Sequence, residues 1–232
     1  MLRRALIATA LVMFGASSAL AVPSKIIILR HGEKASSTAL CSVGISRSLA
    51  LVQEYLGRGA KKSLFGAPQT PAAFLAITLH SLELASPAAA SWNAPVVTYS
   101  VVPLPGANET DDLNARTIQA ANDVLNNPAW NGQIVVMVWE HKHIANKTLA
   151  KSGNVTLRQL LNLDKLTSKD HVHETWEGSN YDYFWIVEYP ANSTTPSGFT
   201  PMRQEFSGPY KSVPSNHWGK AEKLLPNSGC KS

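Results

Sequence analysis

The chain has few cysteines, no extended apolar run beyond its first residues and no cluster of basic side chains among its 232 residues. After residue 21, no segment approaches the ~18 uncharged apolar residues of a membrane-spanning helix, so we expect no span in the mature chain. The lack of a Lys/Arg run like those of nucleic-acid-binding arms argues against a nucleic-acid partner. Cys41 and Cys230 either close one long loop in an oxidising compartment or remain two free thiols.

The first 21 residues have the three regions of a secretory signal. Arg3 and Arg4 precede an apolar run from Ala5 to Gly15, and small residues lead to Ala21. We therefore expect cleavage near Ala21 and export to the periplasm or the extracellular space. Loss of the two arginines lowers the formal net charge from +5 to +3, a weakly basic balance that suits anionic small substrates.

The rest of the chain is long enough for one domain with a sizeable core, and it contains no internal repeat. We predict this domain over residues 22–190. Beyond Pro190 the chain is rich in Ser, Thr, Pro and Gly, which predicts a C-terminal tail over residues 191–232 that packs on the same domain.

Strand-like and helix-like segments alternate along the domain. Short β-branched or apolar runs predict strands, and apolar residues at helical spacing predict helices. Strands are expected at residues 26–29, 74–77, 96–102, 134–139 and 183–189, and helices at 45–56, 80–90, 111–127 and around 157–161. Strands separated by helices require crossover connections, which favours a mostly parallel sheet. We therefore predict an α/β fold, a three-layer α/β/α sandwich.

Two details of these helices can be predicted. The third helix is expected to be capped by Thr110 or Asp111. The first is expected to be amphipathic, with the face that packs on the sheet formed by Ile45, Leu49, Val52 and Leu56.

The first predicted strand ends on a charged cluster, Arg30-His31-Gly32-Glu33. The apolar run before it has no polar alternation, which is typical of a strand covered on both faces. Ligands of open α/β sheets bind at the carboxyl ends of strands, and Gly32 lets a ligand approach the backbone closely. The pattern therefore predicts a site that combines a cation with an imidazole, the alternative being a buried strand followed by an ordinary polar turn.

This tetrapeptide after such a strand resembles the first catalytic motif of the histidine phosphatase superfamily, which has the phosphoglycerate-mutase-like fold. Residues 44–52 resemble the first helix of that family, and residues 133–141 resemble the later strand that delivers its second catalytic histidine. The resemblance covers roughly residues 25 to 189. It implies an exported phosphatase that hydrolyses a small phosphate monoester through a phosphohistidine intermediate and needs no cofactor or metal.

The resemblance also implies a role for each residue of the cluster. His31 would attack phosphorus as a neutral imidazole, and Arg30 would hold phosphate oxygens through its planar guanidinium. His141 would donate to the equatorial oxygens and stabilise the charge that spreads over them in the transition state.

The second phosphate-binding arginine of the family is replaced in this chain. The segment from His80 to Pro87 fits the family's frame with histidine where arginine is expected. His80 can donate one hydrogen bond to phosphate but lacks the permanent charge and the fork of a guanidinium. This departure supports an alternative function, a catalytically weak or inactive member that binds phosphate esters.

Two carboxylates compete for protonation of the leaving alcohol. Glu140 immediately precedes His141, whereas Glu109 follows the third strand, about where one branch of the family carries its acidic donor. Adjacent residues of a strand point to opposite faces, so Glu140 can share a pocket with His141 only if the strand has already ended there.

Two pairs of histidines offer a third functional hypothesis, a zinc-dependent hydrolase. His141 and His143, like His171 and His173, have the alternate spacing with which one face of a strand presents imidazole ligands. Neither pair is accompanied by a motif rich in cysteines or carboxylates.

Overall fold

The computed structural model describes residues 22–102, 104–166, 171–224 and 227–231, so the predicted signal segment lies outside the described residues. The strands are β1 (Lys25–Arg30), β2 (Pro71–Thr78), β3 (Val96–Val101), β4 (Ile134–Trp139), β5 (Tyr183–Glu188) and β6 (Gly198–Arg203). The α-helices are α1 (Ser42–Leu51), α2 (Leu79–Trp92), α3 (Glu109–Asn126), α4 (His141–Ile144), α5 (Lys147–Lys151) and α6 (Leu157–Leu160). A π-helical turn, Val52–Leu56, continues α1. None of these helices is both long and apolar enough to span a bilayer.

The strands form one sheet in the order β3-β2-β4-β1-β5-β6. β3, β2, β4 and β1 are parallel to one another, whereas β5 pairs antiparallel with β1 and with β6. The fold is therefore α/β with a mostly parallel sheet, as the alternation of strands and helices predicts. β6 lies in the segment expected to be a tail, and its position at the sheet edge explains why it tolerates Pro201.

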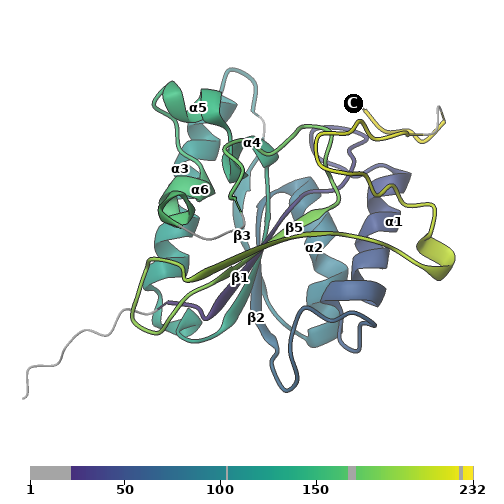
Figure 1. Cartoon of the computed structure of the whole chain (residues 1–232). Helices are drawn as coiled ribbons and strands as arrows, with labels where there is room; N and C mark the ends of the chain where they lie inside the picture. Colours follow the sequence, from purple (N-terminus) through teal and green to yellow (C-terminus); the bar gives the residue numbers. More distant parts are fainter. Residues whose placement is uncertain (1–21, 103, 167–170, 225–226, 232) are drawn as a thin grey trace, which may run out of the picture.

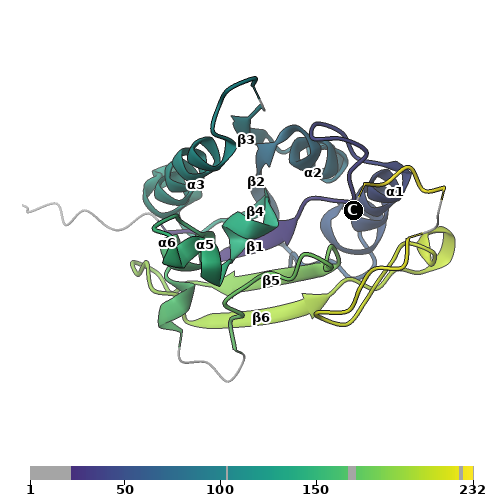
Figure 2. The same ribbon diagram turned by 90° about the horizontal axis from the view of Figure 1, so that it is seen from above.

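Helices cover both faces of the sheet (Figures 1 and 2). α1 and α2 lie on one face, and α3, α5 and α6 lie on the other. In β1, Ile26 and Ile28 join the core under α3 and α6, while Ile27 and Leu29 join the core under α1 and α2. Burial on both faces is the reason that β1 is a continuous apolar run.

The face that α1 buries differs from the expected one. Ile45 and Leu49 are 45% and 44% exposed, whereas Gly44, Arg47 and Ser48 are buried. Gly44 packs against the backbone of the β1–α1 loop, where a Cβ would lie 2.3 Å from the carbonyl oxygen of Glu33. Because Arg47 also bonds to Glu33, a buried ion pair rather than the apolar spacing sets the rotation of α1.

The cap of α3 also differs from the prediction. The side chain of Asn108 accepts a hydrogen bond from the backbone nitrogen of Thr110, so Asn108 is the N-cap. Thr110 and Asp111 are the second and third residues of the helix. At this position the negative charge of Asp111 still interacts favourably with the helix dipole.

The C-terminal residues return to the start of α1. A disulfide joins Cys41, the N-cap residue of α1, to Cys230, with Cα atoms 5.1 Å apart. The segment that ends at Cys230 consequently lies beside α1 (Figure 2). Glu222, from the same segment, contacts Arg47.

Candidate active site

Three adjacent parallel strands deliver the side chains of the candidate site. β2, β4 and β1 are neighbours in the sheet, and their carboxyl ends lie at the same edge. Arg30 ends β1 and His31 follows it, Glu140 and His141 follow β4, and His80 is the second residue of the helix after β2. The sequence-predicted residues other than Glu109 thus meet at one point, as the rule for open α/β sheets requires.

His31 is completely buried and is held in one orientation. Its Nδ1 lies 2.7 Å from the carbonyl oxygen of Gly32, and its backbone nitrogen donates to Trp139. Because a carbonyl can only accept, Nδ1 carries the proton and Nε2 carries a lone pair in the neutral ring. Nε2 has no hydrogen-bond partner among the described residues. Burial lowers the pKa of His31 to about 3, against the opposing effect of Glu140, so the ring is neutral near pH 7.

Glu140 lies between the histidines of the cluster. β4 ends at Trp139, so Glu140 is not constrained by strand alternation and reaches the same pocket as His141. Its Oε2 is 3.0 Å from Nε2 of His31, and its Oε1 is 2.5 Å from Nδ1 of His141. Burial alone would raise the pKa of Glu140, but the contacts with the surrounding histidines outweigh burial and hold the pKa well below its usual range.

His80 is buried beside His31. The ring centroids of the two histidines are 4.3 Å apart. Nδ1 of His80 lies 3.0 Å from the carbonyl oxygen of Ser37, and Nε2 lies 3.8 Å from Oε2 of Glu140. Nε2 of His80 has no hydrogen-bond partner among the described residues, so it faces the cluster with its lone pair uncommitted.

Arg30 is also buried, and it is supported by Tyr181. The guanidinium carbon lies 3.6 Å from the centre of the Tyr181 ring, and Nη1 donates to the carbonyl oxygen of Gly178 at 2.6 Å. The Tyr181 ring lies 5.8 Å from that of His31. This role of Tyr181 could not be predicted from the sequence, because its contact with Arg30 joins residues 151 positions apart and leaves no local signal.

A buried ionic network fixes the turn after His31. Arg47 donates to both carboxylate oxygens of Glu33, at 2.5 to 3.1 Å. It also donates to Gln204 and Glu222 at 3.2 Å. Burial alone would raise the pKa of Glu33, but Arg47 outweighs it and holds the pKa well below its usual range. Burial and the neighbouring Glu33 raise the pKa of Glu222. In the sequence, only the charge of Arg47 within the first predicted helix points to this buried network.

A cavity of about 310 Å³ opens beside the cluster. Its polar lining includes Glu109, Glu140, His141 and the two lysines Lys34 and Lys142. Glu109 is the exposed first residue of α3 and lies at the cavity, whereas Glu140 also contacts three histidines. Of the two carboxylates expected from the sequence to compete for protonation of the leaving alcohol, Glu140 is thus the one in contact with His31.

The paired histidine motifs do not converge on a common site. His143 is buried with neither ring nitrogen hydrogen-bonded to a described residue, and burial lowers its pKa to about 4. The ring of His173 stacks on Trp218 at 4.4 Å and lies 6.1 Å from the ring of His171. Within the described part of the chain, three ligand atoms of His, Cys, Asp or Glu come within 4.8 Å of one another in one set, His31, His80 and Glu140.

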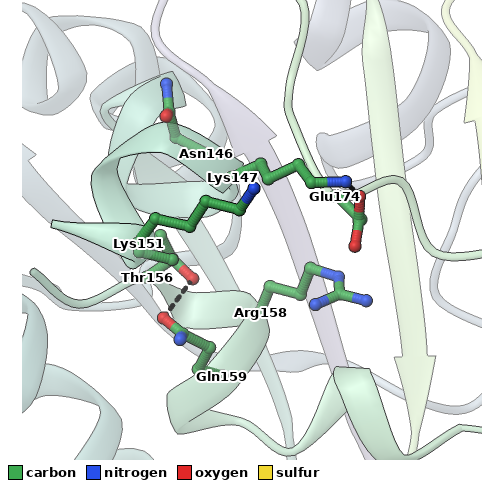
Figure 3. Close-up of a pocket in the computed structure, with 8 residues that line it drawn as sticks. Asn146, Lys147, Lys151, Thr156, Arg158, Gln159 and Glu174 are labelled. Carbon is green, nitrogen blue, oxygen red and sulfur yellow. Dashed lines mark hydrogen bonds and ion pairs between the residues drawn. The ribbon is translucent and has the colours of Figure 1, made fainter. Parts of the chain in front are cut away.

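A second cavity, of about 270 Å³, is formed by the segments around α5 and α6 (Figure 3). Basic side chains from Lys147, Lys151 and Arg158 point into it. Nζ of Lys147 is paired with Glu174 at 2.5 Å. This cavity shares no residue with the histidine cluster and is not part of the candidate active site.

No protein-family model matches the chain, and no curated protein matches it significantly. Among solved structures the chain is similar to one entitled "Mycobacterial hydrolase 2", with a TM-score of 0.41 and 12% sequence identity. The match covers 89% of this chain and 94% of that chain.

Proposed function

We propose that this chain is an exported phosphomonoester hydrolase of the histidine phosphatase type, with the phosphoglycerate-mutase-like fold, in which His31 is transiently phosphorylated. One observation carries the proposal. A buried imidazole at the carboxyl end of β1 is fixed by the bond from Nδ1 to the carbonyl of Gly32, while its Nε2 receives no hydrogen bond from the described residues and faces Oε2 of Glu140 at 3.0 Å. A neutral imidazole held in this way is a nucleophile that needs no further deprotonation.

In the first step, Nε2 of His31 attacks phosphorus in line with the ester oxygen. A P–N bond forms while the P–O bond to the leaving alcohol breaks. Arg30 supplies donors for the phosphoryl oxygens, and the rings of His141 and His80 supply further donors when their Nε2 atoms carry protons. The cations Lys34 and Lys142 at the adjacent cavity favour entry of an anionic substrate.

Glu140 is suited to move the proton that the reaction requires. Without substrate it is an anion, but a phosphate dianion beside it raises its proton affinity, because two neighbouring negative charges disfavour ionisation. Glu140 then donates a proton to the leaving oxygen. As the resulting carboxylate it accepts a proton from the water that attacks the phosphohistidine, and this second step releases inorganic phosphate and restores His31.

A binding function without turnover is the alternative that a specific observation supports. Nη1 of Arg30 is engaged by the carbonyl of Gly178, and position 80 carries an imidazole instead of a guanidinium. Both features weaken the clamp on the phosphoryl group. A chain of this kind would bind phosphate esters in the cavity and release them unchanged.

The deciding experiment is turnover of an aryl phosphate combined with trapping of the phosphoenzyme. The wild-type chain should hydrolyse the ester and carry an acid-labile, base-stable phosphoryl group after rapid quenching. His31→Ala should lose the label and at least about 10³-fold in kcat, as loss of a nucleophile does. His171→Ala, which removes an exposed histidine outside the cluster, is the matched control and should keep both. Turnover by His31→Ala at the wild-type rate would overturn the mechanism, and binding of phosphate without turnover by the wild type would establish the alternative.

A further inference from the structure

The histidine cluster contains a feature that opposes the binding of a phosphate dianion until Glu140 takes up a proton. A carboxylate oxygen of Glu140 lies 3.0 Å from the nucleophilic Nε2 of His31, in the space toward which a phosphate dianion must come. Negative charge at that place repels the substrate. It would, however, attract a metal cation.

We propose that His31, His80 and Glu140 also form a binding site for a divalent transition-metal ion of the zinc class, and that an ion bound there blocks His31. The first part of this inference stands on the geometry of the three side chains alone. The second part, the block, rests on the proposed phosphatase function.

The three donor atoms have the spacing that such an ion requires. Oε2 of Glu140 lies 3.0 Å from Nε2 of His31 and 3.8 Å from Nε2 of His80, and all three atoms lie within 4.8 Å of one another. Zinc binds nitrogen and oxygen at about 2.0–2.2 Å, so the ligand atoms of a tetrahedral site lie roughly 3.4 Å apart. The observed distances bracket this value, and small side-chain rotations suffice to reach it.

Both imidazoles already have the orientation of metal ligands. A ligating histidine usually donates its second ring N–H to a carbonyl or a carboxylate, which fixes the tautomer and directs the other nitrogen to the metal. Here Nδ1 of His31 is bonded to the carbonyl of Gly32, and Nδ1 of His80 is bonded to the carbonyl of Ser37. The two Nε2 atoms are buried without a hydrogen-bond partner from the described residues, which is a costly state that coordination would relieve.

Glu140 has the outer contact that a ligating carboxylate usually has. Its Oε2 faces the two imidazoles, and its Oε1 lies 2.5 Å from Nδ1 of His141. His141 therefore stands behind the carboxylate and fixes its orientation, as outer partners of metal ligands do.

The donor set selects the class of ion. Two imidazoles and one carboxylate suit zinc and related transition metals, whereas Mg²⁺ and Ca²⁺ prefer sites built from oxygen ligands. Position 80 is decisive, because a guanidinium has no lone pair to offer and could not complete the set. An ion bound to Nε2 of His31 occupies the electron pair that would attack phosphorus.

The test measures zinc binding and phosphatase activity separately on the purified chain, after treatment with a chelator. Calorimetry should find one Zn²⁺ per chain, and Co²⁺ should give the absorption of a four- or five-coordinate site. Glu140→Gln keeps the shape of the side chain but loses the charge, and His80→Arg removes an imidazole. Each of these two variants should weaken Zn²⁺ binding by at least about 100-fold. Replacing a residue that only contacts a metal ligand already weakens binding by up to about this factor, and here a ligand itself is changed. His171→Ala is the control and should bind as the wild type does.

Activity toward an aryl phosphate tests the block. Zn²⁺ at the concentration that saturates the calorimetric site should abolish turnover of the wild type, and a chelator should restore it. Whatever activity His80→Arg retains should no longer respond to Zn²⁺ at that concentration.

Absence of Zn²⁺ binding by the wild type, or equally tight binding by both site variants, would overturn the metal site. Activation by Zn²⁺ would overturn the block and leave the site standing. A metal-free chain without any phosphatase activity would defeat the proposed function and the block, while calorimetry would still decide the metal site.

Discussion

The buried network around Arg47 gives the sharpest prediction about stability. Arg47 is fully buried. Its guanidinium donates to the carboxylate of Glu33, to side-chain oxygens of Glu222 and Gln204, and to the carbonyl of Pro214. In Arg47→Met the volume is largely kept, but Glu33 is left buried without its cation. Breaking a buried ion pair in this way costs about 3–5 kcal/mol. For a domain of this size, that corresponds to a fall in Tm of about 6–20 °C.

The assay is chemical denaturation at pH 7, with two companion variants. Arg58→Met replaces an exposed arginine and should change the free energy of unfolding by less than about 0.5 kcal/mol. Glu33→Gln combined with Arg47→Met removes both charges and should be more stable than Arg47→Met alone, because no buried charge is left unpaired at position 33. A cost below about 1 kcal/mol for Arg47→Met would refute the assigned role of this network.

The pH dependence of the same variants provides an independent check. In the wild type, Arg47 holds the pKa of Glu33 below its unfolded value near 4.5. The pair therefore stabilises the fold above about pH 4.5, and this contribution is lost as the pH falls further. In Arg47→Met, burial without a cation raises the pKa of Glu33 instead. The destabilisation relative to the wild type should then shrink as the pH is lowered toward 4.5.

Two further predictions concern catalysis. Glu140→Gln should reduce kcat by about 10²–10⁴-fold for alkyl phosphates. The loss should be much smaller for aryl phosphates, because their leaving groups need no proton. Equal losses across a series of leaving groups would show that Glu140 is not the general acid. Since burial lowers the pKa of His31 to about 3, kcat/KM should show no loss of the nucleophile near pH 6.5 on acidification toward pH 4. This expectation would be wrong if kcat/KM fell on acidification with a midpoint near pH 6.5 and the fall persisted when each histidine other than His31 was replaced. The same pKa shift makes stability fall as the pH drops from about 6.5 toward 3, because the unfolded imidazole takes up a proton that the folded one does not.

The central strands of the sheet could be predicted from the sequence because they are buried on both faces. A fully buried parallel strand is a continuous apolar run, and β1 and β4 have this form. β6 could not be predicted, because an edge strand is less constrained in composition and may contain proline. The pairing of β6 with β5 depends on residues that lie together only in the folded chain.

The site could be predicted as far as strand ends determine it. His31, Arg30 and His141 follow from the rule that ligands bind at the carboxyl ends of parallel strands. The rotation of α1 could not be predicted from apolar spacing, because the pairing of Arg47 with Glu33 places a charged residue on the buried face of the helix. Glu222 carried no local signal, since its partner Arg47 lies 175 residues away.

The position of Glu140 connects the two chemistries argued for this site. A cation near both groups stabilises a carboxylate that lies beside an imidazole lone pair in a buried site. In the proposed turnover that cation is a proton, which Glu140 takes up when the phosphate dianion arrives and passes to the leaving oxygen. In the absence of substrate, a metal ion at the proposed site with His80 would have the same effect. An arginine at position 80 would favour the phosphate and exclude the metal, so the imidazole at this position is the change that makes the two ligands competitors.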